Sequence, residues 1–176
     1  MQFNKKSAEM SEMEKQVVEV SKKLAAGNDL KIKLGELHFN RVRILDLEDC
    51  AKKAAVIYVP CSEINQYKKE EHLAEGFEKH ISGFQFHIVA DRKIEHRTPN
   101  TYHPFCKTSV DVHAKLLEDI VAPGFITGKR ILYSNGTKTH EFYVSKTKKT
   151  DVESRANICS KVYEQLTGMK NVIGFM

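Results

Sequence analysis

The sequence lacks the cysteine patterns that hold metal ions or disulfide frameworks. Its four cysteines are Cys50, Cys61, Cys106 and Cys159, and they form no CxxC pair and no zinc-like spacing. We expect free thiols that pack as small hydrophobic side chains in a reducing compartment. His103 stands close before Cys106 and could supply half of a metal site, but no second pair accompanies it. The sequence therefore predicts no metal site.

Long apolar runs are also missing. No run approaches the roughly 20 consecutive apolar residues that a membrane-spanning helix needs. The first residues, 1–6, lead into a charged helical segment and contain no apolar core of a signal peptide. We therefore expect a protein of the cytosol or the nucleus that makes no membrane contact.

The motifs of well-known enzyme chemistry are absent as well. Gly124 and Gly128 have neither the Walker nor the Rossmann spacing, and no GxSxG nucleophile elbow occurs. Glu118 and Asp119 are neighbours on a predicted helix, where adjacent side chains point in different directions. We expect a solvated face or a salt bridge there rather than an acid–base pair. The sequence thus predicts a protein that is not an enzyme, with no catalytic residues, no cofactor and no small-molecule substrate.

What the sequence does contain is the composition of an ordinary globular protein. Hydrophobic residues make up 41% and charged residues 29% of the 176 positions, which excludes extensive disorder and allows a sizeable core. We predict one domain. It comprises N-terminal helices over residues 1–37, an α+β body over residues 38–168 and a tail over residues 169–176 that docks or frays.

Hydrophobic periodicity predicts the elements of this body. Apolar residues at helical spacing predict helices, whereas alternation or a continuous apolar run predicts strands. The order strand, helix, strand over residues 54–88 predicts a right-handed βαβ unit. We expect a mixed β-sheet packed with helices and completed by a C-terminal β-hairpin. Helices are predicted over residues 11–27, 28–37, 62–82, 110–121 and 151–168, and strands over residues 38–45, 54–59 and 84–88.

The hairpin is the most informative stretch. The dipeptide Asn135-Gly136 separates two alternating runs and favours the left-handed backbone angles of a type I′ turn. Between Gly128 and Lys149, six cations stand against the single acid Glu141, which gives a net charge of +5, equal to that of the whole chain. The rest of the protein is therefore neutral overall. The six cations are Lys129, Arg130, Lys138, Lys146, Lys148 and Lys149.

A neutral body with one basic protrusion favours contact with a polyanion. Two alternatives remain: a solvated edge hairpin whose lysines discourage aggregation, and a module whose basic hairpin meets an acidic protein. The signatures of the RNP1 and KH types of RNA-binding domain are absent. Tyr133, His140, Phe142 and Tyr143 are interleaved with the lysines of the hairpin and could stack on bases, and a strand with one buried face would expose one or two of them.

The sequence resembles a known family in several specific stretches. Residues 117–123, Ile126, the run 128–131 and the hairpin glycine Gly136 closely resemble the eukaryotic small-subunit ribosomal protein number seven family. Further matches cover residues 55–60, 82–83, 91–94 and 162–168. The resemblance thus reaches in the same order from about Asp29 to Phe175, although the loop over residues 94–108 is shorter and less basic than in the family.

This resemblance implies a structural, non-enzymatic protein of the small (40S) ribosomal subunit. Members of the family bind the small-subunit (18S-type) rRNA and neighbouring ribosomal proteins. They take part in subunit assembly, together with assembly factors, and in translation. The implied location is the cytoplasmic ribosome, with the nucleolus and the nucleus during assembly. The alternative is a basic protein-interaction module outside the ribosome.

The expected rRNA contacts are the basic side chains. The six cations of the hairpin and its exit would contact backbone phosphates without reading sequence. Arg92, Lys93 and Arg97 would form a second, weaker contact. Arg97 and Arg130 could bind a phosphate through two parallel hydrogen bonds, whereas lysines act as point charges.

Overall fold

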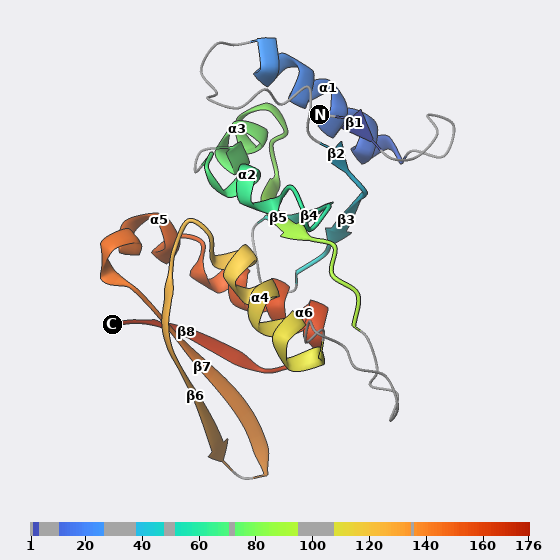
Figure 1. Ribbon diagram of the computed structural model, residues 1–176. Coiled ribbons are helices and arrows are strands. Elements are labelled where there is room, and N and C mark those ends of the chain that lie inside the picture. Colours follow the sequence, from blue (N-terminus) through green and yellow to red (C-terminus); the bar gives the residue numbers. More distant parts are fainter. Residues whose placement is uncertain are drawn as a thin grey trace, which may run out of the picture.

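A computed structural model describes residues 2–3, 11–26, 38–47, 52–70, 73–94, 108–134 and 136–176 (Figure 1). The fold class is α+β, as predicted, but the strands form two three-stranded sheets and a short β1-β2 pair instead of one sheet. In chain order the elements are β1 (Gln2–Phe3), α1 (Glu12–Ala26), β2 (His38–Phe39), β3 (Arg41–Leu45), β4 (Lys53–Val59), α2 (Ile64–Lys68), α3 (Leu73–His80), β5 (Phe84–Ala90), α4 (Ser109–Val121), β6 (Ile126–Ser134), β7 (Thr137–Val144), the 3-10 turn η3 (Lys146–Lys148), α5 (Lys149–Glu153), α6 (Ala156–Thr167) and β8 (Asn171–Phe175).

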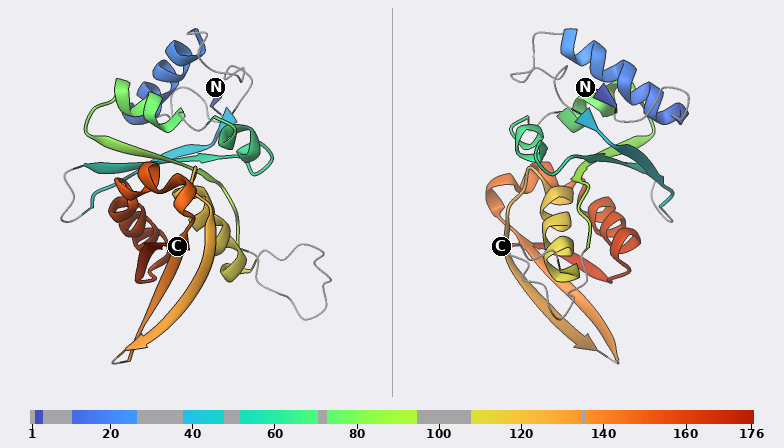
Figure 2. Two further views of the ribbon diagram at one scale, coloured as in Figure 1. Left: turned by 90° about the vertical axis from the view of Figure 1, so that its left-hand side faces the viewer. Right: turned by 45° about the vertical axis from the view of Figure 1, so that its right-hand side comes forward.

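The central sheet has the order β3-β4-β5 and separates two hydrophobic clusters. β3 runs antiparallel to β4, and β5 runs parallel to it, so the predicted parallel pair of a βαβ unit is confirmed. Helices α1, α2 and α3 lie on one side of this sheet, and α4, α6 and the second sheet lie on the other (Figure 2). β4 is buried on both faces, as its apolar run predicts. Ala55, Ile57 and Val59 enter the first cluster, on the side of α1, and Ala54, Val56 and Tyr58 enter the second, on the side of α4.

The helix predicted over residues 62–82 is divided into α2 and α3. Tyr67 and Leu73 are both buried in the first cluster. On one unbroken helix these two positions would lie about 120° apart around the axis, so both could not face the sheet. The break allows each short helix to bury its own apolar face. The segment after Lys149 is likewise two helices, α5 and α6, where the sequence predicts one.

The second sheet has the order β6-β7-β8. β6 and β7 form the predicted antiparallel hairpin, with a register shift between Ile126 and Gly128. The predicted tail is a strand: after Gly168 ends α6 in the left-handed conformation, at φ 73°, β8 pairs parallel with β7. The basic hairpin is therefore part of a sheet at its base.

The N-terminal helix α1 begins with the predicted capping box. The backbone amide of Ser11 donates to the Glu14 carboxylate at 2.9 Å, and the amide of Glu14 donates to the Ser11 hydroxyl at 3.3 Å. Val17 and Val20 of this helix are buried. The predicted stop at Gly27 and the predicted helix over residues 28–37 lie outside the described residues. No helix in the described part of the chain is long and apolar enough to cross a membrane.

The cysteines meet the prediction only in part. Cys61 and Cys159 are free thiols, and Cys159 is buried in the second cluster, where burial raises its pKa to about 12. Cys61, in contrast, is exposed, in the turn that follows the end of β4 at Val59. Cys50, Cys106 and His103 lie outside the described residues.

Candidate nucleic-acid interface

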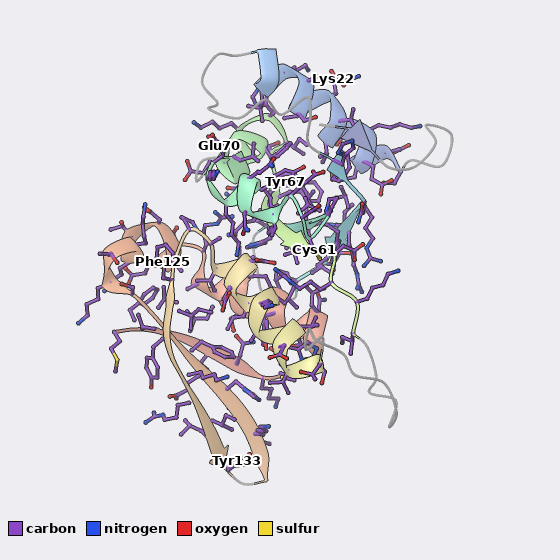
Figure 3. The ribbon with its side chains drawn as sticks, viewed as in Figure 1. Lys22, Cys61, Tyr67, Glu70, Phe125 and Tyr133 are labelled. Atoms are coloured by element: carbon purple, nitrogen blue, oxygen red, sulfur yellow. The ribbon has the colours of Figure 1, made fainter. Side chains whose placement is uncertain are left out.

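The hairpin projects beyond the body of the protein (Figures 1 and 3). β8 pairs with β7 only from His140 to Val144. We call residues 131–134 and 137–139 the free end, because the hairpin is a ribbon of two strands from the Leu132–Thr139 pair to the turn, with Ile131 at its boundary. Tyr133 is 75% exposed and Ile131 43% exposed, and Leu132 is exposed as well. A two-stranded ribbon is only marginally stable in water on its own, so this free end is suited to being covered by a partner.

The register of the hairpin gives its two faces different chemistry. Residues directly opposite each other in an antiparallel pair lie on the same face, and successive residues alternate between faces. Ile131 lies opposite His140, and Tyr133 lies opposite Lys138. Together with Lys129, these residues form what we call the basic face. It is made of Lys129, Ile131, Tyr133, Lys138 and His140.

Arg130 lies on the opposite face, and its charge is balanced there. Glu141 is its cross-strand partner, and the Arg130 Nη2 and Nε atoms donate to Glu141 Oε2 at 2.7 and 3.0 Å. The Tyr143 hydroxyl donates to the same oxygen at 2.8 Å. The hydrogen bond from Tyr143, and to a smaller extent those from Arg130, lower the pKa of Glu141. The Glu141 carboxylate in turn raises the pKa of Arg130. Lys129 and Lys138, in contrast, have no acidic cross-strand partner, so the unbalanced positive charge of the hairpin is on the basic face.

The pKa of His140 reflects the positive charge of the basic face. Partial burial lowers its pKa first, and the positive charges of Lys138 and Lys129 lower it further. The ring also stacks on Phe142, with 6.0 Å between the ring centroids. His140 is thus favoured in the neutral form and adds a flat aromatic surface rather than a third charge.

The remaining three cations of the predicted set lie at the other end of the sheet. Lys146 and Lys148 are in η3 and Lys149 begins α5, after the base of β7. Lys149 Nζ lies 5.8 Å from the centre of the Phe175 ring and 3.7 Å from a Glu153 carboxylate oxygen. Lys138 is about 20 Å from this base at the usual rise of a strand. The six cations are therefore spread along the sheet, with Lys129 and Arg130 opposite Phe142 and Glu141, between Lys138 and the base.

The three residues of the second predicted contact, Arg92, Lys93 and Arg97, also differ in their surroundings. Arg92 pairs with the Asp119 carboxylate, whose side chain is fully buried and whose other oxygen lies 2.6 Å from Lys68 Nζ. The backbone amide of Ala90 donates to Asp119 at 3.1 Å. The predicted salt bridge at the carboxylate pair is thus present at Asp119, while Glu118 points to solvent. Lys93 is exposed, and Arg97 lies outside the described residues.

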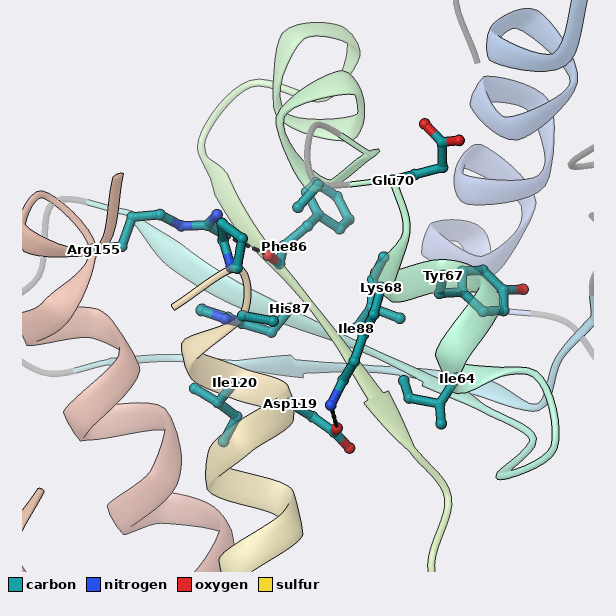
Figure 4. Close-up of a pocket in the computed structure, with 13 residues that line it drawn as sticks. Ile64, Tyr67, Lys68, Glu70, Phe86, His87, Ile88, Asp119, Ile120 and Arg155 are labelled. Carbon is teal, nitrogen blue, oxygen red and sulfur yellow. Dashed lines mark hydrogen bonds and ion pairs between the residues drawn. The ribbon is translucent and has the colours of Figure 1, made fainter. Parts of the chain in front are cut away.

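A small cavity lies between the central sheet and α4 (Figure 4). Its lining includes Lys68, His87, Asp119 and Arg155, and its volume is about 50 Å³. Arg155 Nη2 donates to the Phe86 carbonyl at 2.7 Å, and burial lowers the pKa of His87 to about 3. This space suits one or two water molecules rather than a substrate. Arg155, just before α6, links that helix to β5, and Asp119 links α4 to α2 through Lys68.

Sequence reasoning missed three features of this region. The alternation of β6 and β7 was visible, but the pairing of Arg130 with Glu141 depends on the register. The pairing of Arg92 with Asp119 depends on how α4 packs against β5. The support that β8 gives to the base of the hairpin had no sequence signal beyond the short apolar alternation near the end of the chain.

Comparison with known proteins matches nearly the whole chain to one family. The family model of ribosomal protein S7e matches residues 2–175. The chain is 32% identical over 166 residues to small ribosomal subunit protein eS7 of Drosophila melanogaster, and the match covers 89% of this chain and 84% of that protein. It is 32% identical over 177 residues to eS7z of Arabidopsis thaliana, covering 97% and 92% of the two chains. The corresponding protein of Dictyostelium discoideum is 28% identical over 185 residues, covering 93% and 96%.

The family model reaches from β1 through the hairpin to β8, and these matches confirm the resemblance seen in the sequence. The chain belongs to the ribosomal protein S7e family.

Proposed function

We propose that this protein is a structural constituent of the small ribosomal subunit. It binds small-subunit rRNA and neighbouring ribosomal proteins, and it takes part in subunit assembly and translation. The relatives named above are small ribosomal subunit proteins, and the chain spans most of their length. Its place is the cytoplasmic ribosome, with assembly in the nucleolus and nucleus in contact with assembly factors. It supplies no catalytic group.

The observation that carries the rRNA contact is the basic face of the hairpin. Lys129 and Lys138 are exposed, they lie on one face, and no acidic residue of β6 or β7 shares that face. Lysines in this arrangement bind backbone phosphates and release counterions, which stabilises the complex independently of sequence.

The other predicted cations contribute differently to the proposed contact. Lys146, Lys148 and Lys149 form a second set of phosphate contacts at the base of the sheet, and Lys93 is available beside the end of β5. Arg130 and Arg92 each pair with a carboxylate, so binding to a phosphate would first require breaking that pair. We therefore rank the lysines above these two arginines. Arg97 keeps its place in the proposal on sequence grounds alone.

Co-sedimentation tests the proposal. The tagged full-length chain should run with the small subunit in a high-salt gradient, because many phosphate contacts and protein neighbours hold it there. Reversal of Lys129, Lys138, Lys146, Lys148 and Lys149 to Glu should release it at lower salt. A chain that sediments alone at high salt, or a reversal that leaves its position unchanged, would contradict the proposal and favour an adaptor outside the ribosome.

A further inference from the structure

The apolar residues of the free end are out of place for a solvated hairpin. Phe142 lies on the same side of the sheet as the basic face and meets Tyr163 of α6, with ring centroids 5.6 Å apart. The basic face is therefore the continuation of the core-facing side beyond the edge of the core. Ile131 and Tyr133 stand at positions that would be buried nearer the base, yet they are 43% and 75% exposed. A partner that covers them would bury this surface.

The charges around these residues indicate what kind of partner fits. Lys138 is directly across from Tyr133, and Lys129 is two positions before Ile131 on the same face. Lys138 and Phe142, the cross-strand partner of Lys129, are each two positions from His140 on this face, so both lysines lie beside the aromatic surface. On the opposite face, the Arg130–Glu141 pair leaves no excess charge, and the other residues are neutral. Leu132 is apolar, and Ser134, Thr137 and Thr139 are polar. A partner with negative charge next to flat apolar groups matches the basic face only.

We propose that the basic face binds an unpaired nucleotide, with the base stacked on Tyr133 and the flanking phosphates held by Lys129 and Lys138. This inference rests on the rRNA contact proposed above and specifies that the bound RNA is unpaired at this contact. A base in a duplex has its faces covered by its neighbours, whereas an unpaired base can leave the stack and lie on an exposed aromatic ring. Lysines beside the ring then bind its phosphates.

Binding of small-subunit rRNA fragments by the full-length protein tests this arrangement. Tyr133→Ala should weaken binding to fragments with unpaired loops about tenfold, and Tyr133→Phe, which keeps the ring, should not. Lys129→Gln with Lys138→Gln should lower the slope of log affinity against log salt by about 1.5. The matched control is Thr139→Val, which changes the opposite face at constant net charge, keeps a β-branched side chain and should leave both quantities unaltered.

Two different failures are distinguishable. A wild-type protein that binds no small-subunit rRNA fragment would overturn the proposed function and this inference together. A wild-type protein that binds while Tyr133→Ala and the lysine double variant bind equally well would overturn only the inference. Hydrogen exchange of the β6 and β7 amides in each variant shows whether the hairpin has kept its structure. If the Ala variant loses the hairpin, Tyr133→Leu, which keeps bulk and apolar surface without a ring, takes its place and should show the same loss of binding.

Photo-crosslinking in the assembled subunit separates RNA from protein as the occupant. A photoreactive phenylalanine analogue at position 133 should label an unpaired nucleotide. Labelling of a ribosomal protein alone, or of duplex RNA alone, would overturn the inference.

Discussion

At the scale of single residues, the most consequential group is the carboxylate of Asp119. Its side chain is fully buried, and it joins the end of β5, through Ala90, to the cations of Arg92 and Lys68. A sequence that places an Asp beside a Glu on a helix does not reveal which of the two turns inward. The apolar stripe of α4 passes next to both, and only the packing of α4 against β5 selects Asp119.

Replacing Asp119 should be costly. Asp119→Ala leaves two cations without their anion and the Ala90 amide without its acceptor, so we expect a loss of about 3 kcal/mol in the free energy of unfolding. The exposed neighbour provides the control, because Glu118→Ala should change stability by less than about 0.5 kcal/mol. Urea denaturation followed by circular dichroism measures both. Equal midpoints for the two variants would show that the buried pairing contributes little.

His87 should make stability depend on acid. Burial, and then the charge of Arg155, holds the folded-state pKa near 3, below the ordinary value of 6.5. The unfolded state therefore binds the proton first, and the stabilisation is complete above about pH 6.5 and is lost as the pH falls toward 3. Stability should fall by up to about 1.4 kcal/mol per pH unit within that window.

The variant His87→Leu isolates this contribution. It cannot titrate, so its stability should fall less steeply between pH 6.5 and pH 4.5 than that of the wild type, whatever its absolute value. His80→Gln changes an exposed ring and should keep the wild-type slope. Parallel slopes for the wild type and His87→Leu in urea titrations at several pH values would contradict the assignment.

At the scale of elements, helices were easier to predict than the third strand of the second sheet. The helices α1, α4 and α6 each carry an apolar stripe that repeats along their own sequence. β8 is short, and its partner β7 is reached only after α5 and α6 have returned the chain. Its alternation also contains Asn171 and Gly174, which weaken an intrinsic strand signal. Pairing between distant segments is the information that local periodicity does not contain.

The contribution of β8 can be measured by removing it. A chain that stops after Lys170 should lose protection from hydrogen exchange at the β7 amides that face β8, those of residues 140, 142 and 144, because their parallel partner is gone and the hairpin is two-stranded along its whole length. The melting temperature should fall as Phe142 becomes accessible. Val172→Thr, an exposed position with a similar strand propensity, should leave both unchanged. Retained protection in the shortened chain would show that α6 alone holds the hairpin.

At the scale of the whole molecule, the two hydrophobic clusters share one sheet. β4 sends alternate side chains into each of them, so neither cluster can come apart without exposing part of the central strand. The sequence predicted a buried central strand and a basic hairpin, and both are present. It did not predict how the six cations divide between the two faces of the hairpin and the base of the second sheet.

This shared strand predicts cooperative unfolding. Ile57→Ala opens a cavity in the first cluster and Leu117→Ala opens one in the second, and each should cost about 3 kcal/mol. Each variant should still unfold in one transition, with the amides of α3 and α6 losing protection together. Separate transitions for the two sides in denaturant-dependent hydrogen exchange would show that the clusters are independent.

The register shift between Ile126 and Gly128 has a consequence for how such chains can vary. A single residue inserted before Lys129 would rotate every later side chain of β6 to the other surface, with composition and net charge almost unaltered. Natural variation must therefore preserve whether each residue of β6 stands at an odd or an even position from the start of the strand. An insertion at the turn, or an insertion of two residues, preserves these positions. An insertion of one residue changes them without changing the number of lysines.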